Sequence, residues 1–193
     1  MAIDARTITT IVAVRYLDAA KILHKNSPNL NALWEPLNHL FAMSAELALK
    51  AFLEGSGVSE KDLKQSNIRH SLNALLILAV QKGLRTSYDV ADVLIEMNEA
   101  HALHAYRYIP RPEEGEFATV YSAHPAAAFA AIQRLLDQCA IDPFELRKQT
   151  MFPDNWPHPS LPVHPVTAEQ LEGWIAEKKS LREWSRTLKT TGY

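Results

Sequence analysis

The stretch AELALKAFLEGSG, residues 45–57, belongs to the segment that decides the fold. Apolar side chains recur in this segment at three- and four-residue spacing, and others fill the opposite side of the same helix. The broad face carries Leu33, Leu37, Leu40, Phe41, Leu47, Ala48 and Ala51, and the opposite side carries Ala42, Leu49 and Leu53. A helix that is apolar nearly all round is a buried one. We therefore predict a central helix that begins between Asn31 and Pro36 and runs to Glu54, where glycines follow.

One narrow strip of this central helix is polar. His39, Glu46 and Lys50 lie along it, and Glu46 with Lys50 forms a favourable i, i+4 pair. The strip has two interpretations: a solvated edge, or a buried polar row that meets Arg15 or the histidines of a later helix. Arg15 enters the second interpretation because it lies inside the apolar stripe of its own helix, where an arginine needs an acid or a carbonyl as its partner.

Helical periodicity continues on both sides of the central helix. We predict a first helix over about residues 5–25 and a short helical turn at 59–63. A further helix is predicted over 72–82, with Ser71 as its N-cap and Gly83 just past its end.

The next helix carries two histidines on its apolar face. It starts near residue 87, and its stripe consists of Val90, Val93, Leu94, Met97, His101, His104 and Tyr108. Pro110 prevents the helix from continuing. This spacing predicts that both histidines lie on the same buried side of the helix as Val93 and Met97.

The C-terminal third changes in composition. After a helix predicted over 125–139, five prolines fall within residues 153–165 and indicate a stiff, extended strap. Thr167 and Gln170 form a capping-box pattern for a last, amphipathic helix over about 168–189. We predict an all-α fold: a four- or five-helix bundle over 1–145, then the strap and the terminal helix over 146–193.

Bulk properties narrow the class of protein. The 193 residues carry a formal net charge of −2, which disfavours indiscriminate binding to nucleic acid through overall charge. The single cysteine has no partner for an internal disulfide, as is usual in a reducing cytosol. No signal peptide and no membrane span are recognised in the sequence. These features predict a cytoplasmic protein that does not contact a membrane.

Three passages in this order resemble the HEPN superfamily of prokaryotic helical domains. They are AELALKAFLEGSG (45–57), IRHSLNALL (68–76) with KGL (82–84), and YRY (106–108) ahead of a proline. The resemblance covers about residues 8–138. It implies a four- or five-helix bundle, often dimeric, associated with RNA cleavage, toxin–antitoxin pairs, phage defence or nucleotidyltransferase partners. His70 resembles the histidine that opens the third helix of the family.

The catalytic pattern of that family is an Arg, a polar residue, and a His about four to six residues after the Arg. In such a site the His moves a proton and the Arg holds the RNA phosphate. No histidine of this chain follows an arginine at that spacing. Arg107 falls near the expected position, but residues 112–114 are Pro, Glu and Glu. The resemblance therefore favours a non-catalytic module. The alternative is a divergent metal-independent ribonuclease in which Arg107 acts with His101 or His104.

Two further hypotheses concern what such a module does. The leading one is a homodimer that engages RNA, a nucleotide or a partner protein, in a defence or toxin–antitoxin-like system. The other is a purely structural dimerising protein. No cofactor is predicted.

The candidate binding residues come from three predicted helices and from the connector that precedes the helix over 72–82. They are Arg15, His39, Glu46, Lys50, His70, Tyr106, Arg107 and Tyr108. Several cationic groups around one glutamate would attract an anion such as phosphate, and the alternative is an internal ion-pair network. His101 and His104 could also chelate a metal, with Glu46 or His39 completing the site. Since zinc needs three or four convergent ligands and the chain has neither an HExxH motif nor a cysteine cluster, we predict no metal.

The terminal helix carries a basic stripe. It consists of Lys179, Arg182, Arg186 and Lys189, and Trp174 and Trp184 flank it. Three roles are open for this helix: contact with nucleic-acid phosphates, a solvated face, or docking through its apolar side on the same or another subunit.

Overall fold

The computed structural model describes residues 5–27, 33–108, 123–156 and 161–190. All regular secondary structure in these ranges is helical, which confirms the predicted all-α fold. The elements are α1 (Ala5–Asn26), α2 (Trp34–Gly55), α3 (Glu60–Leu63), α4 (Leu72–Gln81), α5 (Tyr88–Ala102), α6 (Pro125–Cys139), α7 (Pro143–Arg147), a 3-10 helix (Pro153–Asn155) and α8 (Ala168–Thr190).

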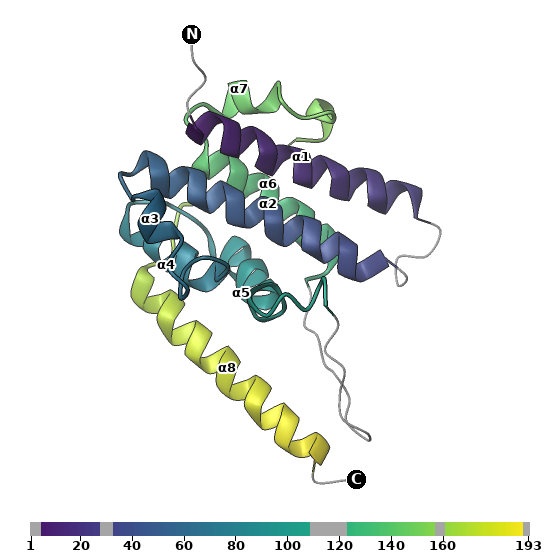
Figure 1. The fold of residues 1–193 in the computed structure, drawn as a ribbon, viewed down its shortest axis with the longest axis vertical. Helices are drawn as coiled ribbons and strands as arrows, with labels where there is room; N and C mark the ends of the chain where they lie inside the picture. The colour runs from purple at the N-terminus through teal and green to yellow at the C-terminus, as the bar shows by residue number, and fades with distance from the viewer. Residues whose placement is uncertain (1–4, 28–32, 109–122, 157–160, 191–193) are drawn as a thin grey trace.

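Helix α2 is the centre of the bundle, as its all-round apolar sequence predicts. It runs antiparallel to α1 and also contacts α4, α5 and α6 (Figure 1). Small residues lie at the α1–α2 contact, where the Ser44 hydroxyl donates to the Ala13 carbonyl oxygen at 2.8 Å. Eleven of the residues of α2 are buried, among them Glu46. The polar strip of α2 is therefore not a solvated edge along its whole length.

Local capping signals set several helix ends where the sequence predicts them. The Ser59 and Ser71 side chains accept hydrogen bonds from the first turns of α3 and α4. Gly83 follows α4 with a φ of +97°, a conformation that glycine adopts without strain. Thr167 and Gln170 exchange two hydrogen bonds at the start of α8, which confirms the capping box.

Helix α5 ends earlier than its apolar stripe predicts. The helix stops at Ala102, and His104 lies in the left-handed region with a φ of +56°. Ala105 N–H donates to the Ala100 carbonyl, and His104 N–H donates to the His101 carbonyl. These two bonds form a Schellman motif in which a histidine takes the position usually held by glycine. The prediction that His104 and Tyr108 extend the helical stripe was wrong, because the chain reverses before it reaches them.

The segment after α6 returns to the bundle. The buried Asp18 carboxylate of α1 accepts from the Thr150 hydroxyl at 2.6 Å and from Met151 N–H at 2.8 Å. The Trp156 indole N–H donates to Asp137 of α6 at 3.0 Å. Residues beyond the predicted boundary at position 145 thus pack on α1 and α6 of the bundle. Two of the five prolines of the predicted strap, Pro157 and Pro159, lie outside the described residues.

Helix α8 docks on the bundle of its own chain. Leu171 is fully buried, and Trp174 stacks on Tyr88 with ring centroids 3.8 Å apart. Val166 N–H, just before the helix, donates to the Thr86 carbonyl. The first half of α8 covers α4 and α5, and its C-terminal end extends past them (Figure 1). Among the described helices, none has the length and apolar character needed to cross a membrane.

Candidate functional site: a histidine-lined pocket over a buried glutamate

Glu46, in the middle of α2, is a buried carboxylate with three donors. Its Oε1 accepts from Lys50 Nζ at 2.5 Å. Its Oε2 accepts from His101 Nε2 at 2.6 Å and lies 3.3 Å from His70 Nδ1. We call these four residues the Glu46 cluster. They join α2 to the last turn of α5 and to the turn that precedes α4.

Local structure aligns the donors with the carboxylate. Glu46 and Lys50 lie one turn apart on α2, and Lys50 also donates to the Arg69 carbonyl oxygen at 2.8 Å. The side-chain oxygen of Asn98, on α5, accepts from Asn73 N–H at 3.0 Å and is within 3.3 Å of the Ser71 hydroxyl. Asn98 thereby fixes the start of α4 against α5, which places His70 beside His101. No pattern in the sequence predicts this role of Asn98.

The hydrogen bonds keep Glu46 ionised. Burial by itself raises the pKa of a carboxyl group, because it penalises the charged form. Here the hydrogen bonds from His101 and Lys50, together with their positive charge, outweigh burial and lower the pKa of Glu46 from 4.5 to about 2. The carboxylate therefore carries a negative charge inside the bundle at neutral pH, matched by the lysine next to it.

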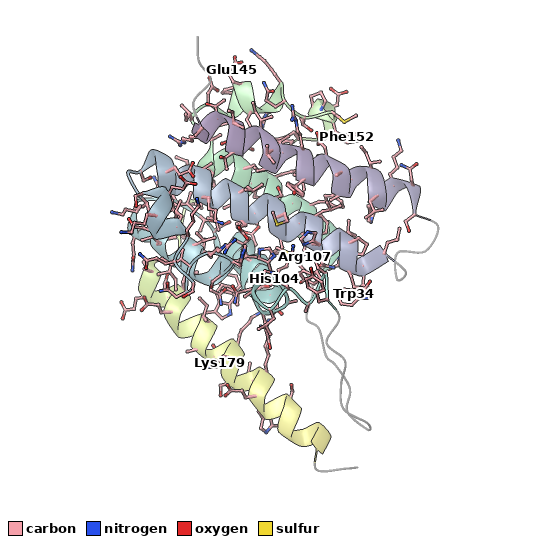
Figure 2. The ribbon with its side chains drawn as sticks, in the orientation of Figure 1. Trp34, His104, Arg107, Glu145, Phe152 and Lys179 are labelled. Atoms are coloured by element: carbon pink, nitrogen blue, oxygen red, sulfur yellow. The ribbon has the colours of Figure 1, made fainter. Side chains whose placement is uncertain are left out.

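A small pocket opens beside the cluster. It has a volume of about 110 Å³ and is lined by His39, Met43, His70, Ala100, His101, His104, Tyr106 and Arg107. We call it the histidine pocket. Arg107 donates to His104 Nδ1 at 3.0 Å, and the two side chains lie together at the end of α5 (Figure 2). The rings of His70 and His104 meet edge to face, with centroids 4.9 Å apart.

Arg107 places a positive charge at the rim of the pocket. The pKa of His39 is lowered by burial and then by the neighbouring His101 and Arg107. The pKa of His104 is lowered by partial burial and then by Arg107 and His70. Burial is the largest cause for both histidines, and the neighbouring positive charge further opposes an added proton. An anion placed between these groups would remove that opposition.

The structure brings together most, but not all, of the residues predicted to form the site. His39, Glu46, Lys50, His70, His101, His104 and Arg107 lie in or beside the histidine pocket. Arg15 does not, because its side chain is exposed on the outer face of α1, so the prediction of an inward arginine was wrong. Tyr106 is buried edge to face against Trp34, whereas Tyr108 is exposed.

The predicted basic stripe of α8 is not a free cationic surface. Arg182 turns toward α5, where its guanidinium donates to Glu96 at 2.8 Å and to Glu99 at 3.3 Å. Lys179 is exposed, with Glu183 3.9 Å away. The side chains of Arg186 and Lys189 lie outside the described residues. The stripe is thus divided, because one of its members is used to dock the helix.

Sequence spacing did not predict the pair of histidines that meets Glu46. It paired His101 with His104, three residues away on one helix, but the reversal at His104 turns that residue toward the rim. The fold instead places His70 beside His101 at Glu46. Within the described part of the chain, Glu46, His70 and His101 are a group of metal-ligating side chains whose ligand atoms all lie within 4.8 Å of one another.

Comparisons with models of known protein families, with curated proteins and with solved structures return no match to this chain.

Proposed function

We propose that the chain is a HEPN-type, non-catalytic binding module that holds a phosphate group of RNA in the histidine pocket. The observation that carries the proposal is the position of Arg107 and His104 together at the pocket rim, above a glutamate whose charge is already matched. A guanidinium with free N–H groups is the side chain best suited to a phosphate oxygen pair.

The charge distribution supports an anion over a cation at the rim. Lys50 and His101 engage both oxygens of Glu46, so the negative charge of the carboxylate is already paired. The polar side chains that line the pocket are four histidines, Arg107 and Tyr106. Because the protein carries a net charge of −2, this attraction is local and favours one phosphate contact rather than a broad nucleic-acid surface.

The size of the pocket limits what enters it. Its volume of about 110 Å³ is well below the roughly 300 Å³ of pockets that enclose a whole small-molecule ligand. A phosphate group fits such a space, and the ribose and base would lie outside it. Binding through this pocket alone is therefore expected to be weakly dependent on base sequence.

The wider biological setting is also part of the proposal. The HEPN resemblance supports a cytoplasmic homodimer that works in a defence or toxin–antitoxin-like system. Size-exclusion chromatography with light scattering tests the dimer, and a monomeric mass at all concentrations used would contradict it.

The binding test is fluorescence anisotropy of a labelled single-stranded RNA. We expect Arg107→Ala to weaken binding by about tenfold and to reduce the salt dependence by about one phosphate contact. Arg85→Ala is the matched control, since Arg85 is an exposed arginine outside the pocket, and it should bind like the wild type. Equal affinity of wild type and Arg107→Ala would overturn the proposal.

A second candidate is a divergent metal-independent ribonuclease that uses Arg107 with His104 or His101. The 3.0 Å contact between Arg107 and His104 favours it, since a histidine and an arginine side by side can move a proton and hold a phosphate. Cleavage of RNA in the presence of a chelator, lost in both Arg107→Ala and His104→Ala, would replace the binding module with this enzyme. Absence of both cleavage and binding at low salt would leave a structural dimerising protein.

A further inference from the structure

We propose that Glu46, His70 and His101 form a binding site for a divalent transition-metal ion of the zinc type. One carboxylate oxygen and one ring nitrogen from each histidine lie within 4.8 Å of one another. Imidazole nitrogen and carboxylate oxygen are ligands that zinc takes readily, and three protein ligands leave one position open. The site does not rest on the proposed RNA contact.

The distances are close to those of a tetrahedral site. With metal–ligand bonds of about 2.0–2.2 Å, two ligand atoms of such a site lie roughly 3.4 Å apart. His70 Nδ1 lies 3.3 Å from Glu46 Oε2, which already matches this separation. His101 Nε2 lies 2.6 Å from the same oxygen, as a hydrogen bond requires. A metal ion between them therefore needs the His101–Glu46 separation to increase by less than about 1 Å.

The scaffold carries two ligands on packed helices and the third on a turn. Glu46 and His101 are buried on α2 and α5, two helices that pack against each other in the core. His70 is half-buried in the turn before α4. The helix backbones can stay in place while the Glu46 and His101 side chains rotate to widen their separation and His70 on the turn follows, so an ion enters without repacking of the bundle.

Lys50 is the main competitor of the metal, and the structure gives it another partner. Its ammonium group donates to Glu46 and also to the Arg69 carbonyl oxygen, at 2.8 Å. Glu46 can therefore turn one oxygen to the ion while Lys50 keeps a hydrogen bond. Each histidine must present a ring lone pair in place of the N–H that it directs at Glu46, so its proton moves to the other ring nitrogen or to solvent. The nearby positive charge of Lys50 lowers the affinity for the ion.

The open coordination position faces the histidine pocket. His70 and His101 are part of the wall of that pocket, and His104 lies edge to face with His70. A fourth ligand at the metal would be water or the His104 ring, since both reach the pocket. The prediction of no metal from the sequence paired His101 with His104 and with Glu46 or His39, and it did not include His70 from the turn before α4.

The test is a titration of the full chain, freed of metal with a chelator, with Zn²⁺ alone and Co²⁺ alone. We expect one ion per chain, a higher melting temperature, and the visible absorption of four-coordinate Co²⁺. His70→Ala should weaken Zn²⁺ binding by at least about tenfold. His124→Ala, which removes an exposed histidine at the start of α6, should bind like the wild type. Circular dichroism confirms that the variants keep their helices.

A replacement ligand makes the test specific. His70→Cys should restore binding and add the near-ultraviolet charge-transfer band of a Co²⁺–thiolate bond. Absence of stoichiometric binding by the wild type would overturn the proposal. So would a His70→Ala variant that binds like the wild type, or a His70→Cys variant without the new band. Because no RNA is present, failure of this test is distinct from failure of the RNA contact.

Discussion

Two polar clusters lie on opposite sides of α5, and they differ in how water reaches them. On one side His101 joins the Glu46 cluster inside the bundle. On the other side Asp92, Glu96 and Glu99 meet Lys178 and Arg182 of α8. We call this second group the α8 seam. At 3.6 residues per turn, the three acids share one face of α5 and His101 falls on the opposite face.

This difference in access to water determines which contacts depend on a fixed geometry. Side chains of the α8 seam are partly exposed, so water can replace a lost partner and the ion pairs contribute modestly. Glu46 is buried, so the loss of a donor leaves a charge that water cannot reach. A buried charge of this kind does little for stability as a whole, but it sets one arrangement of the helices around it.

The largest expected effect comes from removing the centre of the buried cluster. Glu46→Ala should lower the free energy of unfolding by about 3 kcal/mol, because Lys50 and His101 lose their acceptor in the interior. Urea unfolding followed by circular dichroism measures it. Glu60→Ala, which removes an exposed glutamate, is the control and should leave the unfolding midpoint unchanged. Equal midpoints for the two variants would contradict the proposed contrast between buried and exposed carboxylates.

The pH dependence of stability should follow the same carboxylate. Its pKa in the folded state, about 2, is below the value of 4.5 for a free glutamate. A depressed pKa stabilises the protein above pH 4.5, and this contribution is lost as the pH falls toward 2. Wild type should lose about 2 kcal/mol more than Glu46→Gln between pH 4.5 and pH 2. Parallel unfolding curves for the two proteins over this range would count against a charged Glu46.

Removing a carboxylate of the α8 seam should lower the free energy of unfolding less than Glu46→Ala does, and this loss should depend on the salt concentration. Glu96→Gln should lower the free energy of unfolding by about 1 kcal/mol, since Glu96 pairs with both Lys178 and Arg182. The difference from wild type should shrink in 1 M salt, because the Debye length there is about 3 Å and exposed ion pairs are screened. Lys179→Ala, one residue from Lys178 but exposed, should stay within about 0.5 kcal/mol of wild type. If the loss of stability in Glu96→Gln does not change with salt, the α8 seam behaves like the buried Glu46 cluster, which contradicts the contrast between them.

The smallest expected effect is a gain. His104→Gly should raise the free energy of unfolding by about 0.5–1 kcal/mol, because His104 has a positive φ that glycine adopts without strain. His104→Ala keeps that strain and should show no gain. If the histidine is retained for binding, His104→Gly should also weaken RNA binding in the anisotropy assay. Lower stability of His104→Gly than of His104→Ala would show that the rim contacts outweigh the backbone strain.

The positions of the helices followed from local signals in the sequence. Ser71 and Gly83 mark the two ends of α4, and Thr167 with Gln170 marks the start of α8, because caps act within one turn of the chain. The end of α5 was mispredicted, since a histidine rarely takes the left-handed position of a Schellman motif and gives no local sign that it will.

The candidate site was only partly predictable. The pairing of Glu46 with Lys50 depends on positions one turn apart on one helix, so the sequence contains it. The contact of Glu46 with His70 and His101 joins residues that are 24 and 55 positions away in the chain. Periodicity within a helix describes which residues share a face, but not which face of another helix they meet.

By itself the sequence determined an all-helical chain with a buried central helix and capped ends, because periodicity and capping are local properties of the backbone. Only the tertiary structure decided that Arg15 faces outward, that Arg182 docks α8 on α5, and that His70 lies beside His101. Each of these depends on the packing of separate helices, where burial and charge are balanced over the whole bundle.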